Sequence, residues 1–213
     1  MSDSQATRSD PALRNVHSCA QLAAVRKQWE TQSDAQWSDR NDANNGDLWV
    51  FGYASLIWKQ EFTFTERRAA RVHGWHRALQ MWSTINRGSP ECPGLVFALL
   101  PGGSCQGVVF RIPKSQALQA LDDLWFREMP GDVYEPRWLS CATDQGDVKA
   151  LAFTLPRSSQ SFCGELTPAQ YRQIFSQACG RYGTTLDYAQ RTYDSLLAEG
   201  IQDHALARLL RHF

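Results

Sequence analysis

A glutamate stands at the end of an apolar helical pattern in the middle of the sequence. Leu118, Leu121 and Trp125 are spaced by three and four residues, which places them on one face of a helix predicted over 115–126. Three residues further along is Glu128, with apolar neighbours and a Pro-Gly pair shortly after it. A carboxyl group at the end of a buried face loses water, which raises its pKa and suits it to general acid–base chemistry.

The helix pattern leaves two interpretations of Glu128 open. If the helix extends to this residue, its carboxyl group lies at the edge of the core beside a cleft. If the helix ends at Phe126, Glu128 is exposed or forms a pair with Arg127.

A turn of small residues follows the most apolar strand of the chain. The strand is predicted over 48–53, and Gly52, Ala54 and Ser55 leave the backbone that follows it accessible. Successive free N–H groups in such a turn bind anions, and an amino-acid carboxylate is one such anion. An ordinary Gly/Ser turn without a ligand gives the same pattern. Neither a P-loop nor a dinucleotide-binding glycine pattern is present.

Other groups that could do chemistry lack partners at the required spacing. His73 and His76 have no carboxylate or cysteine to complete a zinc site. Ser55 is not in a nucleophile-elbow sequence, and no cysteine has a recognised histidine partner. Arg87, in a loop between strands, either binds a carboxylate or lies on the surface. We therefore expect no metal and no cofactor.

The elements around these residues indicate an α+β fold. Strands follow one another without crossover helices, which favours a curved or closed sheet. We expect a Pro-Gly-Gly turn at 101–103 to join two of them in a hairpin. The predicted strands cover 48–53, 77–83, 94–100, 107–112, 133–142 and 148–155.

Helices are expected at the two ends of the chain. Thr167 caps a helix to about residue 179, another ends before Gly200, and Asp203 caps a short last helix. Residues 1–46 form either a loose polar arm or a helix over 13–29, with an apolar face made of Leu13, Val16, Ala20, Ala23, Ala24 and Trp29. The main domain is expected over 47–213.

Composition excludes several classes of protein. The 213 residues contain 22 Lys plus Arg and 22 Asp plus Glu, so no broad charge would attract nucleic acid or anionic lipid. The apolar runs are too short to span a membrane, and the polar N-terminus has no secretion segment. We therefore expect a cytoplasmic protein with reduced cysteines.

Four segments, taken in order, resemble the ChaC family of γ-glutamylcyclotransferases. They are VFGYASLIWK at 50–59, STINRGSPECPGLVFALLPGGSCQGVVFRI at 83–112, LWFREMPGDVYEPRWL at 124–139 and the tail from 178 to 210. The resemblance covers about residues 47–210. It implies a mixed β-barrel with flanking helices and a helical C-terminal tail.

The resemblance also implies an activity. Family members cleave glutathione, a small-molecule substrate, into 5-oxoproline and cysteinylglycine, and Glu128 matches their catalytic glutamate. The substrate loop corresponds to Val50, Phe51, Gly52, Tyr53, Ala54 and Ser55, and Tyr134 matches a pocket tyrosine. Arg87 falls within the second matching segment.

One residue departs from the family pattern, and two other functions stay open. The family's loop glycine is Ala54 here, and an alanine at a positive φ would cost about 1–2 kcal/mol. The alternatives are a cyclotransferase for other γ-glutamyl compounds, and a non-catalytic binding or regulatory protein on the same fold, such as one in cation transport.

Overall fold

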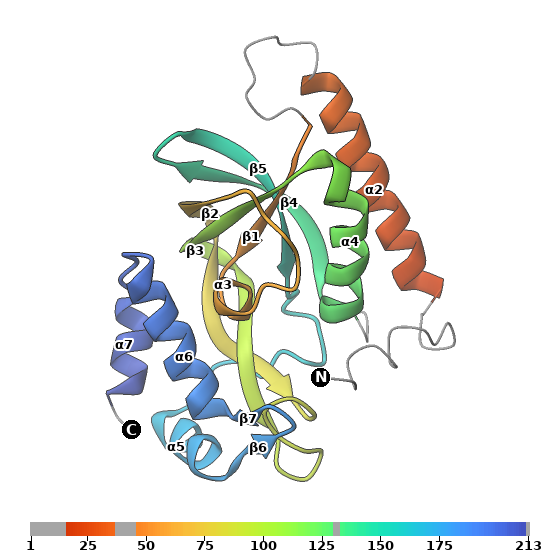
Figure 1. Cartoon of the computed structure of the whole chain (residues 1–213). Coiled ribbons are helices and arrows are strands. Elements are labelled where there is room, and N and C mark those ends of the chain that lie inside the picture. Colours follow the sequence, from red (N-terminus) through yellow and green to blue (C-terminus); the bar gives the residue numbers. More distant parts are fainter. Residues whose placement is uncertain (1–15, 37–45, 130–132, 212–213) are drawn as a thin grey trace.

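The computed structural model describes residues 16–36, 46–129 and 133–211. A closed barrel of five strands forms the centre, two helices cover one side of it, and the C-terminal helices pack below (Figure 1). The strands are β1 (Leu48–Gly52), β2 (Glu66–Ser83), β3 (Gly94–Ile112), β4 (Glu135–Thr143), β5 (Gly146–Thr154), β6 (Cys179–Gly180) and β7 (Gly183–Thr184). The helices are α2 (Val16–Gln36), α3 (Ser55–Trp58), α4 (Lys114–Glu128), α5 (Pro168–Gln177), α6 (Thr185–Ala198) and α7 (His204–Leu210).

The barrel is mixed, in agreement with the expected fold class. Its strand order is β1-β3-β2-β4-β5, and it closes because β1 also pairs with β5 in parallel. All its other neighbouring strands pair antiparallel. Strand β1 is buried along its whole length, which explains why its sequence is continuously apolar rather than alternating.

The predicted hairpin at 101–103 is wrong. Strand β3 continues through this segment and pairs with β2 from Ser83–Gly94 to Glu66–Arg111. Gly102 and Gly103 have φ angles of 102° and 73°, and the pairing register shifts at the facing Gly74, whose φ is 79°. These conformations, which side chains disfavour, bend the two-stranded ribbon instead of reversing it.

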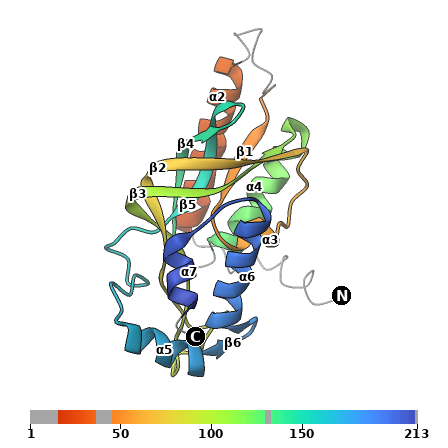
Figure 2. The same cartoon turned by 90° about the vertical axis from the view of Figure 1, so that its left-hand side faces the viewer.

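The bent ribbon of β2 and β3 joins two parts of the molecule. One end belongs to the barrel, and the other end extends down to the C-terminal helices (Figures 1 and 2). The basic run at 66–77 lies in β2, where the buried residues Ala70 and Val72 alternate with exposed neighbours.

Within the N-terminal segment, residues 16–36 form a helix. Helix α2 packs on α4 through Val25 and Trp29, which are buried. The predicted apolar positions Ala20, Ala23 and Ala24 are instead exposed, because burying the larger pair removes more apolar surface from water. The first three residues of the predicted 13–29 helix lie outside the described residues.

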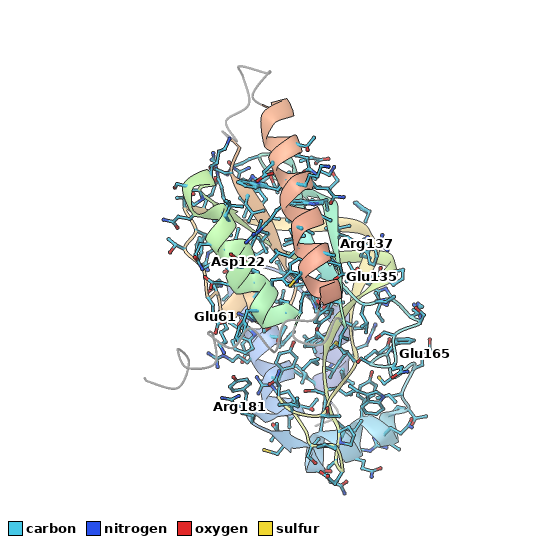
Figure 3. All side chains as sticks on the ribbon, turned by 90° about the vertical axis from the view of Figure 1, so that its right-hand side faces the viewer. Glu61, Asp122, Glu135, Arg137, Glu165 and Arg181 are labelled. Carbon is cyan, nitrogen blue, oxygen red and sulfur yellow. The ribbon has the colours of Figure 1, made fainter. Side chains whose placement is uncertain are left out.

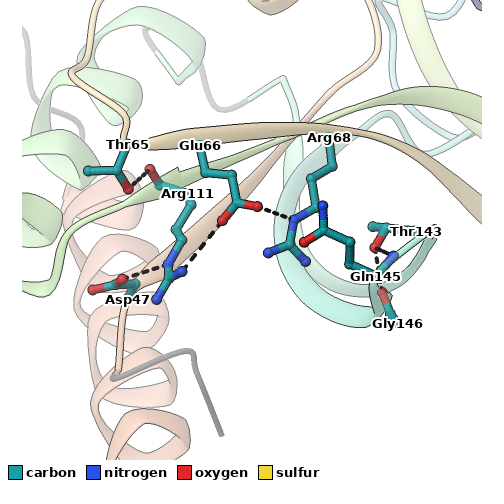
Figure 4. A network of polar contacts seen from close by, with 8 residues as sticks. All are labelled: Asp47, Thr65, Glu66, Arg68, Arg111, Thr143, Gln145 and Gly146. Carbon is teal, nitrogen blue, oxygen red and sulfur yellow. Dashed lines mark hydrogen bonds and ion pairs between the residues drawn. The ribbon is translucent and has the colours of Figure 1, made fainter.

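Charged residues connect the end of β3 to the starts of β1, β2 and α4. Arg111 Nε donates to Asp47 Oδ2 at 2.7 Å, and Arg111 Nη1 lies 3.4 Å from Glu66 Oε2 (Figure 4). Glu66 in turn accepts from Arg68 Nε at 2.5 Å. Asp47 also accepts from the backbone N–H of Lys114 at 2.8 Å, which ties the start of β1 to the start of α4.

The C-terminal caps agree with the sequence. Thr167 and Gln170 form a capping box on α5, and Asp203 accepts from Leu206 N at the start of α7. Gly200, with a φ of 73°, follows the end of α6. None of the described helices combines the length and apolar character needed to cross a lipid bilayer.

Candidate active site

Glu128 is the last residue of α4, so the helix extends past Phe126 to the position that sequence analysis required. Met129 is the C-cap that follows the helix, and its N–H donates to Trp125 O at 2.9 Å. Trp125 and Met129 are both buried, and the Glu128 side chain is only 15% exposed. The prediction for Leu118 is wrong: this residue is 47% exposed, because it lies at the side of the face that α4 buries. That face consists of Ala117, Ala120, Leu121, Leu124 and Trp125.

The carboxyl group of Glu128 is both buried and paired. Burial raises its pKa above the ordinary value, and the nearby charge of Glu61 acts in the same direction. Arg127 opposes the rise in pKa, since its Nε lies 2.9 Å from Glu128 Oε1. The two sequence-based interpretations therefore each hold in part: the site is buried, and the arginine pair exists.

Arg127 also connects Glu128 to the turn after β1. Its Nη2 donates to Ser55 Oγ at 3.0 Å, and its Nη1 donates to the carbonyl of Lys59. These contacts place the end of α4 against α3, so the predicted carboxylate and the predicted turn meet in space.

Three buried tyrosines interact electrostatically with the same carboxyl group. Burial raises the pKa values of Tyr53, Tyr134 and Tyr188, and the charge of Glu128 raises them further. Tyr53 donates its hydroxyl proton to Phe153 O at 3.1 Å, and a side-chain hydrogen bond joins it to Tyr134. Neutral phenols next to a buried carboxyl form a cluster that can donate hydrogen bonds to a substrate oxygen.

The predicted loop residues point in different directions. Val50 and Phe51 are fully buried and pack in the two core clusters on opposite faces of β1. Gly52 faces Phe110, where an added Cβ would lie 3.0 Å from the ring. Of these residues, Tyr53 interacts electrostatically with Glu128, so only part of the predicted loop is connected to this carboxyl group through its side chains.

Ala54 adopts a conformation that does not require glycine. Its φ is −147°, outside the left-handed region. The strain considered for an alanine at this position is therefore absent. Ser55 begins α3, and the backbone hydrogen bonds of this turn start with Ile57 N donating to Ala54 O at 2.9 Å.

Arg87 lies beneath the surface, behind Tyr188. It is 9% exposed, and its guanidinium carbon lies 4.9 Å from the Tyr188 ring centroid. Its Nη1 donates to the carbonyl of Tyr182, and burial lowers its pKa. The backbone around it is tightly packed: a Cβ at Gly94 would lie 2.0 Å from the Arg87 carbonyl oxygen.

The turn is braced from a second side by Arg77. Its Nη1 donates to the carbonyl of Tyr53 at 2.8 Å and to that of Gln106 at 3.0 Å. The same guanidinium pairs with Asp203, and its Nε lies 3.0 Å from Oδ2. The start of α7 therefore supports the backbone of the turn.

Sequence analysis gave no role to Arg127 or Tyr188. Tyr188 could have been found from the hydroxyl groups on the buried face of α6, where Thr185, Tyr188 and Thr192 follow at helical spacing. For Arg127 the sequence indicated only the pair with Glu128, because its other contacts, with Ser55 and Lys59, come from a segment distant in sequence.

The described histidines, cysteines and acidic residues do not form a metal site. Among residues 16–36, 46–129 and 133–211, no three His, Cys, Asp or Glu side chains gather in a way that could hold a metal ion. His76 Nδ1 contacts the Gly102 carbonyl at 2.8 Å. All six cysteines are free.

Comparison with known proteins agrees with this geometry. The model of the family described as ChaC-like protein matches residues 48–213. The chain is 33% identical over 168 residues to the glutathione-specific γ-glutamylcyclotransferase of Escherichia coli K12, covering 78% of this chain and 73% of the relative. It is 33% identical over 182 residues to human glutathione-specific γ-glutamylcyclotransferase 1, covering 80% of each.

Solved structures share the fold. The crystal structure of the yeast γ-glutamyl cyclotransferase specific to glutathione aligns with a TM-score of 0.69 at 22% identity, over 78% of this chain and 95% of that one. YkqA from Bacillus subtilis aligns with a TM-score of 0.54 at 17% identity, over 86% of this chain and 58% of that one.

Proposed function

The chain belongs to the ChaC-like protein family, and on that premise we propose that it is a cytoplasmic γ-glutamylcyclotransferase that cleaves glutathione. The products are 5-oxoproline and cysteinylglycine. This function accounts for a site with a buried carboxyl group and several neutral hydroxyls. It fits a family whose curated members in Escherichia coli and human bear the same activity in their names.

The reaction needs no covalent enzyme intermediate. The α-amine of the γ-glutamyl group attacks the γ-carbonyl carbon of the same group, which forms a C–N bond and closes a five-membered ring. The C–N bond to cysteine then breaks, and cysteinylglycine leaves as an amine. The protein has to fold the substrate into this geometry, accept a proton from the attacking ammonium group, return one to the leaving amine, and stabilise the oxyanion.

Glu128 is the proton acceptor in this proposal. An α-ammonium group has a pKa of about 8 and an ordinary glutamate about 4.3, so proton transfer between them costs roughly 5 kcal/mol. Burial raises the pKa of Glu128 and lowers this cost. Arg127, whose Nε lies 2.9 Å from Glu128 Oε1, opposes this rise and favours the ionised form that acts as the base. The same carboxyl group then protonates the leaving amine.

The turn after β1 and the tyrosines bind the γ-glutamyl group in this proposal. Backbone N–H groups of the turn that follows β1 hold the α-carboxylate, which leaves the α-amine directed at Glu128. The hydroxyls of Tyr53 and Tyr134 lie next to the same carboxyl group and donate to the γ-carbonyl oxygen as it gains charge. Arg87 adds a positive charge behind Tyr188 and attracts the carboxylate from a longer distance.

One observation supports this function more than any other. A carboxyl group with a raised pKa lies at the end of a helix, and an arginine connects it to the turn that carries the family's substrate segment. Neither feature is needed to stabilise a barrel.

The test is Glu128→Gln, which keeps the shape of the side chain and removes the base. We expect glutathione binding by calorimetry to persist and 5-oxoproline release to fall by about 10²–10⁴-fold. Glu165→Gln is the matched control, since Glu165 is exposed and lies on the opposite side of the molecule from Glu61 (Figure 3). Unchanged 5-oxoproline release by the Glu128 variant would remove this residue from the role of base.

A further inference from the structure

An exposed tyrosine lies between two cations beside the candidate active site. Tyr182, on the turn between β6 and β7, is 51% exposed. Lys59 Nζ lies 4.9 Å from its ring centroid, and the guanidinium carbon of Arg181 lies 5.4 Å from it. Because both cations lie against the same exposed ring, they form one positively charged surface around an aromatic side chain.

The first connection from this surface to the active site runs through Lys59. The carbonyl of Lys59 accepts from the guanidinium of Arg127, and that guanidinium also pairs with Glu128. Lys59 Nζ lies 3.4 Å from Glu61, whose charge acts on the pKa of Glu128. The lysine is therefore next to the proposed base.

The second connection runs through Arg87. The carbonyl of Tyr182 accepts from Arg87 Nη1, and Arg87 stacks on the ring of Tyr188. Tyr188 interacts electrostatically with Glu128. The exposed tyrosine and the buried carboxyl group are thus joined by contacts on two sides, which fixes the charged surface at the edge of the same site.

The charge of this surface is incompletely neutralised. Lys59 pairs with Glu61, but both side chains are exposed, at 46% and 38%, so this pair is weak and exchangeable. Arg181 has no carboxylate partner within the described parts of the chain. Glu61 and Arg181 appear on the same side of the molecule in Figure 3. An anionic group that arrives here meets one unpaired cation and one that is readily released.

We propose that Lys59, Tyr182 and Arg181 form a subsite for the glycine carboxylate of glutathione. This inference rests on the proposed function. Glutathione has two carboxylates, and the γ-glutamyl one is assigned to the turn after β1. The cysteinylglycine part extends about 7 Å beyond the γ-carbonyl when its two residues are extended. Its terminal carboxylate then leaves the buried site and reaches the cationic edge, so the subsite selects peptides with a free C-terminal carboxylate.

The experiment compares glutathione with the same peptide whose glycine carboxylate is an amide, by the initial rate of 5-oxoproline release. We expect the unmodified protein to prefer glutathione in kcat/KM, mainly through KM. Arg181→Met should lower that preference roughly fivefold, and Lys59→Met in addition should lower it further, because each exposed ion pair contributes modestly. The preference in the unmodified protein should also decline with ionic strength, since these charges are exposed.

Arg157→Met is the matched control. Arg157 is also exposed, and its guanidinium carbon lies 5.5 Å from the ring of Phe162, a similar geometry away from Glu128. It should leave the ratio of the two kcat/KM values unchanged. An active protein that processes both peptides equally, or an Arg181 variant with an unaltered ratio, overturns the subsite alone. Failure of the unmodified protein to release 5-oxoproline from glutathione overturns the proposed function, and the subsite with it.

Discussion

Two carboxyl groups in this molecule have nearly the same surroundings by simple measures, yet their pKa values shift in opposite directions. Glu128 and Asp203 are each paired with an arginine, and their side chains are 15% and 16% exposed. Burial raises the pKa of Glu128, and the charge of Arg127 only reduces that rise. Burial acts on Asp203 too, but Arg77 and two backbone N–H groups overcome it and lower the pKa.

The difference lies in how many hydrogen bonds each carboxylate accepts. Asp203 accepts two from the guanidinium of Arg77 and others from Leu206 N and Ala205 N at the start of α7. Glu128 lies at the C-terminal end of α4, where no helix N–H groups point at it, and Arg127 divides its donors among three acceptors. Pairing with an arginine is therefore not sufficient for the ionised form of a buried carboxyl group to stabilise the fold.

The largest expected effect is on the free energy of unfolding, in which variants of Asp203 and Glu128 should differ. Asp203→Asn leaves Arg77 buried without its counter-charge, so we expect the free energy of unfolding to fall by about 3 kcal/mol. Glu128→Gln should change it by well under this amount, because the wild-type carboxyl is already destabilised by burial. Urea unfolding at pH 7, followed by circular dichroism, measures both. Equal losses in the two variants would contradict the comparison.

A smaller effect concerns the pH dependence of the same free energies. The pKa of Glu128 is raised, so its contribution to stability is present below its unfolded value of about 4.3 and is lost as pH rises through the folded value. Glu128→Gln should therefore gain on the wild type as pH rises from about 4.3 through the folded value, and the difference should then stay constant.

For Asp203 the sign is reversed. Its pKa is lowered, so its contribution is present above the unfolded value of about 3.9 and is lost as pH falls through the folded value. The deficit of Asp203→Asn should therefore shrink in acid. Unfolding curves from pH 3 to 8 would contradict both assignments if the two variants followed parallel lines.

The smallest expected effect is kinetic. Because Arg127 opposes the rise in the pKa of Glu128, Arg127→Gln should raise that pKa further. The acid limb of kcat/KM for glutathione should then move to higher pH. Arg137→Gln is the control, since its pair with Glu135 is exposed and should leave the limb in place. An acid limb that stays fixed in both variants would show that Arg127 does not tune the base.

Local signals predicted much of this arrangement. The spacing of apolar residues placed Glu128 at the end of a buried helix face, and the caps at Thr167 and Asp203 were readable from single residues. The continuous apolar run identified β1, and the absence of crossover helices indicated a curved or closed sheet.

Features that depend on contacts between residues far apart in the sequence could not be predicted from the sequence. Two glycines at 102 and 103 resemble a hairpin turn in sequence, and only the pairing of β3 with β2 on both sides of them shows a bend. The periodicity of α6 shows that Tyr188 faces inward but not that it meets Glu128. The exposure of Leu118 likewise depends on which neighbours cover α4.

Arg77 connects the start of α7 to the turn after β1, and this connection affects when the turn can form during protein synthesis. Arg77 holds the carbonyl of Tyr53, and the carboxylate that neutralises Arg77 is 126 positions later in the chain. Strand β1 also needs β5 to close the barrel. A ribosome must therefore deliver nearly the whole polypeptide before the turn after β1 can take its final position, so nascent fragments that stop short of Asp203 are expected not to cleave glutathione.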